Sequence, residues 1–77
     1  MEQLHKSVNK EIQIKVKRNR IFRGTLKSFD QHLNILLENV TYKYKMEDEQ
    51  KNSKDFEEKL DQIVLRGDNV IFIEFAQ

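Results

Sequence analysis

Alternating apolar and polar positions predict strands over most of this chain. Residues 11–17 read Glu-Ile-Gln-Ile-Lys-Val-Lys, so apolar and polar side chains alternate strictly. A period of two is typical of a strand with one face buried. We therefore expect a half-buried strand here, with Ile12, Ile14 and Val16 on its inner face.

The N-terminal segment has a helical pattern instead. Leu4 and Val8 lie four residues apart with polar residues between them. This spacing predicts a short helix over about 2–10 with one apolar face. A helix of this length is unstable alone, so it should pack against the rest of the fold.

A second strand is predicted over 21–29, after a polar turn at 17–20. Gly24 lies in the interior of this strand, where a glycine weakens pairing but permits a sharp bend. Such a bend allows a small sheet to curl into a barrel. We interpret Gly24 as architectural.

The third strand is predicted to begin near Leu33 and to continue to about Met46, because the alternation resumes at Val40. Residues 47–58 are almost wholly charged or amide, which is the composition of a solvated hairpin tip. A fourth strand is expected over about 59–66.

The fifth strand is expected over 70–75, and it shares an unusual feature with the fourth. Residues 63–65 and 70–73 are apolar at consecutive positions, whereas a strand with one solvated face would alternate. Both faces of these strands should therefore be covered. A single small barrel would also leave its first and last strand edges unpaired, so the pattern indicates contact with further copies of the chain.

Composition narrows the possible functions. The chain has 77 residues, no Cys and two His, so disulfides and Cys-ligated zinc are excluded and oligomerisation is the remaining route to a stable small domain. No apolar run approaches the roughly 18 residues of a spanning helix, and no signal peptide is apparent. We expect a soluble cytoplasmic protein. Because 14 Lys and Arg nearly balance 13 Asp and Glu, any nucleic acid should bind at a local site.

Two segments carry a recognisable motif. Residues 24–38 read GTLKSFDQHLNILLE, and residues 66–69 read RGDN between two apolar runs. Together they resemble the two halves of the Sm/LSm signature, in the expected order and with strand-like flanks. The resemblance extends from Leu4 to Phe75, and it is to the compact archaeal Sm-like proteins.

This resemblance implies a mainly β fold. A short N-terminal helix would precede a strongly bent five-stranded antiparallel sheet that closes into a small barrel, with the strands over about 11–76 and one domain over 1–77. In the family, the fourth strand of one subunit pairs with the fifth of its neighbour until a ring closes. The chain is thus expected to form a homo-oligomeric ring, most often a heptamer in the archaeal members.

The resemblance also implies a site for single-stranded uridine-rich RNA at the pore, and a role in RNA processing or metabolism. His32 and Arg66 would stack on the two faces of one base, and Asn34 would read its edge. Asp68 would orient Asn34, and Gly67 would let the backbone approach the base closely. No metal or cofactor is implied.

Other interpretations remain open at this stage. Asp30 is expected to cap its own turn and is left outside the site. An enzyme is disfavoured, because the sequence has no nucleophile motif and no Gly-rich phosphate loop. A barrel that binds single strands on exposed aromatics is disfavoured because Phe22, Phe72 and Phe75 lie in runs that look buried. The main alternative is a structural ring that scaffolds proteins through hairpin 47–58.

Overall fold

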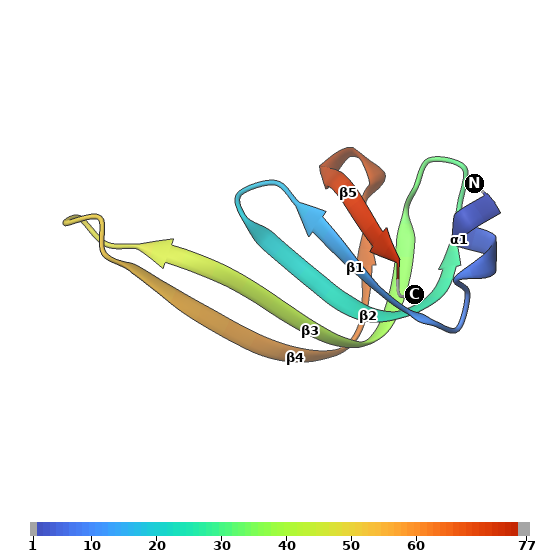
Figure 1. Cartoon of the computed structure of the whole chain (residues 1–77), viewed down its shortest axis with the longest axis horizontal. Coiled ribbons are helices and arrows are strands. Elements are labelled where there is room, and N and C mark those ends of the chain that lie inside the picture. Colours follow the sequence, from blue (N-terminus) through green and yellow to red (C-terminus); the bar gives the residue numbers. More distant parts are fainter. Residues whose placement is uncertain (1, 76–77) are drawn as a thin grey trace.

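The computed structural model describes residues 2–75, in which one short helix precedes five antiparallel strands (Figure 1). The order of the strands in the sheet is β4-β3-β2-β1-β5, so β4 and β5 form its two edges. This architecture confirms the expected mainly β fold, and the predicted strand end at residue 76 lies outside the described residues. The elements are α1 (Glu2–Lys6), β1 (Glu11–Val16), β2 (Arg20–Phe29), β3 (Ile35–Glu47), β4 (Ser53–Leu65), the 3-10 turn η1 (Gly67–Asn69) and β5 (Val70–Phe75).

The sheet bends at an irregularity in the pairing of β2 with β3. The register between the two strands slips at Gly24. A Cβ atom added to Gly24 would lie 2.9 Å from the carbonyl oxygen of Glu38 and 3.1 Å from a methyl group of Val40. Asn39, on the facing strand, has a left-handed backbone with φ of 53°. The close approach and this irregularity together produce the bend, which agrees with an architectural role for Gly24.

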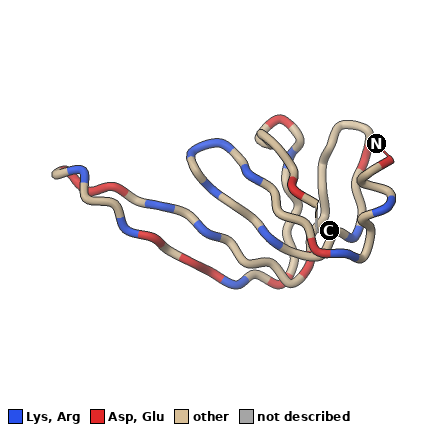
Figure 2. The backbone as a smooth tube through the Cα atoms, viewed as in Figure 1, with Lys and Arg blue, Asp and Glu red and all other residues tan. Residues whose placement is uncertain are grey.

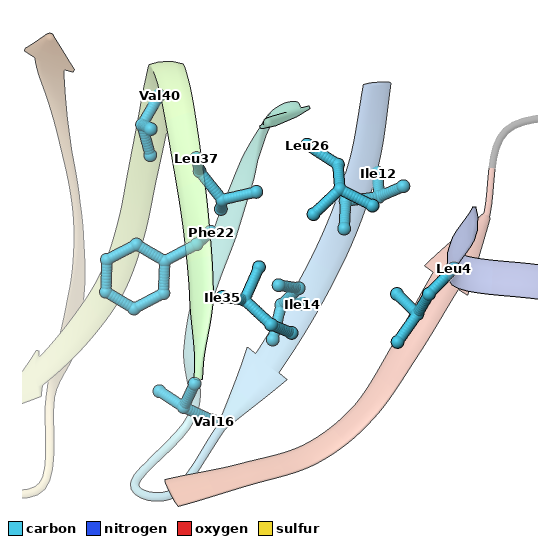
Figure 3. Close-up of a cluster of buried hydrophobic side chains, with 9 residues drawn as sticks. All are labelled: Leu4, Ile12, Ile14, Val16, Phe22, Leu26, Ile35, Leu37 and Val40. Carbon is cyan, nitrogen blue, oxygen red and sulfur yellow. The ribbon is translucent and has the colours of Figure 1, made fainter. Parts of the chain in front are cut away.

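The core lies inside this bend and combines side chains from α1 and from β1 to β3 (Figure 3). Alternate residues of β1 point into it, as the sequence pattern predicted, and are at most 1% exposed. The buried apolar residues are Leu4, Ile12, Ile14, Val16, Phe22, Leu26, Ile35, Leu37 and Val40.

The helix is shorter than the predicted span of 2–10 and ends at Lys6. Asn9 has a left-handed backbone with φ of 69°, which is incompatible with a continuing helix. Its N–H donates to the carbonyl of Leu26 at 2.7 Å instead, so the chain turns into β1 there. Leu4 is buried as expected, because the single helical turn packs on the core.

The predicted hairpin tip over 47–58 is solvated, since all of its residues except Phe56 are exposed, but the predicted start of the fourth strand was wrong. β4 begins at Ser53 rather than near 59, and it stays paired with β3 along its whole length. The connecting turn contains residues 48–52, where Oδ1 of Asp48 accepts the N–H groups of Gln50 and Asn52. Residues 41–59 therefore form a two-stranded extension, here called the ribbon, which projects from the rest of the sheet (Figure 1).

Aromatic stacking explains why so polar a segment is a strand. The ring of Phe22 stacks on Tyr42, Tyr42 on Tyr44, and Tyr44 on Phe56, with centroid separations of 4.5, 4.8 and 5.2 Å. This aromatic ladder crosses from β2 through β3 to β4. Stacked pairs contribute about 0.5–1.5 kcal/mol each beyond their buried area, which supports the ribbon without a full core beneath it.

Ion pairs between the strands support the ribbon as well. Lys43 pairs with Glu57 at 3.7 Å, and Lys45 pairs with Asp55 at 3.9 Å. Each pair joins residues that are directly opposite in the β3–β4 register. Opposite charges at such positions stabilise a sheet, so charges that indicated a loop by composition belong to matched strands.

Both edge strands expose large apolar side chains. Val64 on β4 is 66% exposed, and Ile71 and Phe72 on β5 are 55% and 45% exposed. The expectation that Phe72 is buried is wrong for the single chain, because β5 has a neighbour on one side only. No helix within residues 2–75 has the length and apolar character needed to cross a membrane.

Candidate nucleic-acid interface

Two turns from distant parts of the sequence meet at one end of the sheet. The first, residues 30–34, joins β2 to β3, and the second, η1, joins β4 to β5. They meet because Ile35 at the start of β3 pairs with Leu65 at the end of β4. All five residues that the motif assigned to the site lie on these two turns, namely His32, Asn34, Arg66, Gly67 and Asp68.

Asp30 organises the first turn. One oxygen of its carboxylate, Oδ1, accepts the backbone N–H groups of His32 and Asn34 at 2.9 and 3.0 Å. The other oxygen, Oδ2, accepts the side-chain Nδ2–H of Asn34 at 3.0 Å. These bonds hold the pKa of Asp30 below its ordinary value of 3.8, and the bond from the Asn34 side chain has the largest effect. The carboxylate thus caps the turn and fixes the Asn34 amide at once.

Asn34 links the two turns directly. Its Oδ1 atom accepts the backbone N–H of Gly67 at 3.1 Å. The NH₂ group of Asn34 therefore faces a carboxylate and its oxygen faces a donor, so the amide has one preferred orientation. These bonds leave one N–H and one oxygen lone pair of the amide available to bind a ligand.

Gly67 is required because another backbone lies close to it, and not because of its own backbone conformation. Within residues 2–75 no glycine has a positive φ, so the turn does not use the left-handed conformation that a Gly-Asp-Asn sequence suggests. A Cβ atom on Gly67 would instead overlap the carbonyl oxygen of His32. The absence of a side chain lets the second turn pack against the backbone of the first.

Asp68 does not orient Asn34 as the resemblance implied. Its carboxylate Oδ2 pairs with the Nη2 atom of Arg66 at 3.1 Å, and the two side chains are 63% and 75% exposed. The carboxylate on Asn34 is that of Asp30, which sequence reasoning had assigned only to its own turn. The Asp-x-x-x-Asn spacing was the available signal, because one carboxylate has enough acceptors for both tasks.

The outward side of the site is open to solvent. His32 and Arg66 are both exposed, whereas Asn34 and Gly67 are partly buried. An imidazole and a guanidinium both offer flat faces on which a base can stack. Within residues 2–75, no three His, Asp or Glu side chains are grouped so that they could hold a metal ion.

Comparison with known proteins identifies the family. The model of the LSM domain matches residues 2–75. The chain belongs to the Sm/LSm family. An Sm-like small nuclear ribonucleoprotein (snRNP) relative from Pyrococcus furiosus is 34% identical over 73 residues, which are 95% of this chain and 86% of the relative.

Solved Sm structures agree with this assignment. The chain matches a heptameric archaeal Sm protein with a TM-score of 0.76 and 32% identity, over 100% of both chains. It matches the Sm protein of Pyrococcus abyssii, solved in complex with a uridine heptamer, with a TM-score of 0.75 and 29% identity, over 97% of this chain and 94% of that chain. The bent five-stranded sheet is the Sm fold.

Proposed function

We propose that this Sm-like protein binds single-stranded uridine-rich RNA with one base in each subunit of a closed homo-oligomeric ring. The observation that carries the proposal is the hydrogen bond from Gly67 to Asn34, because it assembles the two turns into one site. The uridine heptamer bound by the P. abyssii protein supports the choice of ligand.

His32 and Arg66 hold the two faces of the base. Each side chain is exposed on its own turn, and the bond from Gly67 to Asn34 joins those two turns. Asp68 restrains the guanidinium of Arg66 through their ion pair, so the stacking plane is partly ordered before RNA arrives. Stacking contributes about 1–3 kcal/mol per base and tolerates any base.

The fixed amide of Asn34 supplies the preference for uridine. A freely flipping amide could present its donor and acceptor in either order, and would fit uracil and cytosine alike. Asp30 and Gly67 select one order, because the carboxylate of Asp30 can only accept a hydrogen bond and the backbone N–H of Gly67 can only donate one. Uracil and cytosine differ in this order on their Watson–Crick edges, so one orientation of Asn34 discriminates between them.

The ring follows from the two edge strands. β4 and β5 are unpaired on their outer sides, and their exposed Val64, Ile71 and Phe72 form an apolar surface at those edges. Pairing of β4 with β5 of the next subunit covers these residues and leaves no open edge there. The heptameric archaeal Sm protein supports seven as the number of subunits. Linked pockets then bind a strand tightly through avidity.

We place the protein in the cytoplasm, as a binding protein of RNA processing or metabolism rather than an enzyme. The alternative is a structural ring that engages proteins through residues 47–58, and the ordered ribbon gives that idea a defined surface.

Binding of fluorescent oligouridine to rings of the parent and of Arg66→Ala tests the proposal. We expect Arg66→Ala to weaken binding about tenfold or more, because each subunit loses a cation and a stacking plane. Lys6→Ala, which removes an exposed cation from α1, is the matched control and should bind like the parent. Equal affinities of the parent and Arg66→Ala would favour the scaffold instead.

A further inference from the structure

The outer half of β4 remains unpaired even in the proposed ring. β4 has 13 residues, whereas β5 has 6, so a neighbouring β5 covers about half of the β4 edge. The exposed Val64 places that contact at the inner end of β4, next to the core. Residues 53–59, here called the outer β4 edge, keep their backbone N–H and C=O groups unpaired on one side. Such an edge is a template for another strand.

The charge of the ribbon argues against RNA as the strand's partner. Residues 41–59 contain six carboxylates and five lysines. Figure 2 shows charges of both signs on the ribbon, with basic residues along β3 and acidic residues near the tip and along β4. The ribbon therefore has no excess of positive charge with which to bind a phosphate backbone, so the occupant should be a polypeptide that carries both charges.

The aromatic ladder ends at this edge. Phe56 is its last ring and belongs to the edge strand, and the Nζ atom of Lys54 lies 5.8 Å from the centre of that ring. A second Phe56 across the edge would continue the ladder, since aromatic side chains at opposed positions on paired strands interact favourably.

Geometry limits how the edge can pair with itself. In an antiparallel pair, directly opposed residues point to the same face of the sheet. When two copies of one edge pair, an even-numbered residue can therefore lie opposite only an even-numbered residue, and an odd-numbered residue opposite only an odd-numbered one. Alignment about Asp55 would place Phe56 opposite Lys54, and alignment about Glu57 would place it opposite Glu58, so neither gives an aromatic pair. Alignment about Phe56 places ring against ring and sets Lys54 opposite Glu58 twice.

On the other face of the strand, this alignment brings acidic residues together. Asp55 would lie opposite Glu57, which are both acidic. Each of them already pairs with a lysine of its own β3 strand, at 3.9 Å for Asp55 and 3.7 Å for Glu57. The alignment about Phe56 therefore combines a ring–ring pair with two Lys54–Glu58 pairs, and lysines of β3 offset its two acidic pairs.

We propose that the outer β4 edge pairs antiparallel with the same edge of a second copy of the chain, about a two-fold axis at Phe56. Two rings would join face to face through their ribbons. The proposal rests on the proposed ring only for the number of chains in the whole assembly, because the edge contact itself needs just two chains.

Charge reversal tests the register. Lys54→Glu places two carboxylates opposite each other at each end of the contact, and Glu58→Lys places two lysines there. Native mass spectrometry and light scattering at high micromolar concentration should show paired rings for the parent and single rings for either variant. Since every subunit of a ring contributes such a contact, association should weaken at least about tenfold.

Two rescues follow from the symmetry of the contact. The double variant Lys54→Glu/Glu58→Lys should pair again, because it restores opposite charges in exchanged positions. An equal mixture of Lys54→Glu rings and Glu58→Lys rings should also form mixed pairs, because each supplies the charge that the other lacks. Lys51→Glu and Glu49→Lys carry the same charge changes in the turn at residues 48–52 and should pair like the parent.

The outcomes separate this proposal from the ring. Parent rings that stay single at every concentration would overturn it, and so would paired rings that neither reversal disrupts. The parent could instead form dimers and no rings. If each reversal disrupts these dimers and mixing restores them, the edge contact is supported and the proposed ring is contradicted.

Discussion

The backbone N–H of Gly67 donates a hydrogen bond of 3.1 Å to Oδ1 of Asn34, although the two residues are 33 positions apart in the sequence. Pairing of β3 with β4 brings them together, and Asp30 holds the other end of the same amide. Reversing the amide would break both side-chain bonds, at a net cost of about 0.5–1.5 kcal/mol each. The site thus presents one order of donor and acceptor to a base.

Gly67→Ala should separate the two turns. The new Cβ would overlap the carbonyl oxygen of His32, which is backbone and cannot move aside as a side chain would. We expect a loss of about 1–3 kcal/mol in the free energy of unfolding, measured with urea, and weaker binding of oligouridine. Asp68→Ala keeps the glycine and should leave stability within about 0.5 kcal/mol of the parent. A Gly67→Ala protein with parental stability and affinity would contradict the packing of the turns.

Acid should release the Asn34 amide. The pKa of Asp30 is lowered in the folded protein, chiefly by its bond from Asn34, so the bonds of its carboxylate stabilise the fold above pH 3.8 and are lost as the pH falls through the lower folded value. NMR shifts of the Asn34 side-chain amide should therefore titrate with a midpoint below 3.8. In Asp30→Asn that titration should disappear. A midpoint at or above the ordinary value would show that the carboxylate is not held in this way.

The two isoleucines of β5 should respond differently to a carboxylate. Ile71 is 55% exposed, so Ile71→Asp should leave the chain folded and prevent assembly of the ring. Ile73 is partly buried against the core, so Ile73→Asp should lower stability itself, because it buries an unpaired charge. Native mass spectrometry and circular dichroism distinguish these effects. Intact Ile71→Asp rings would place the subunit contact elsewhere.

The ribbon should be dispensable for RNA binding. Replacing residues 45–55 with an Asn-Gly turn keeps Tyr44 opposite Phe56 and closes the hairpin with a favoured two-residue loop. The shortened protein should form single rings that bind oligouridine with parental affinity. Loss of binding by an intact shortened ring would move part of the RNA site onto the ribbon.

The sequence predicted best where one physical effect dominates. The alternation in β1 identified Ile12, Ile14 and Val16 as core residues, because burial of one sheet face imposes it directly. The ribbon was missed because its stability comes from pairs such as Tyr44 with Phe56, which are 12 positions apart and cannot be recognised before the register is known.

For the candidate site, the motif named residues but not all of their contacts. The motif indicated His32, Asn34, Arg66 and Gly67, and the structure brings their two turns together. The separate tasks of the two carboxylates were not visible, since Asp30 and Asp68 both resemble simple turn residues in the sequence. Distances alone assign Asp30 to Asn34 and leave Asp68 with Arg66.

The ratio of affinities for oligouridine and oligocytidine, measured by fluorescence anisotropy on parent and Asn34→Ala rings, tests the proposed site most directly. His32→Ala is the matched control, because it removes a stacking face and should weaken binding to both RNAs alike. We predict that Asn34→Ala lowers the preference for uridine about tenfold or more, since each engaged subunit loses its edge contact. An unchanged ratio in Asn34→Ala rings would contradict recognition of the base by this amide.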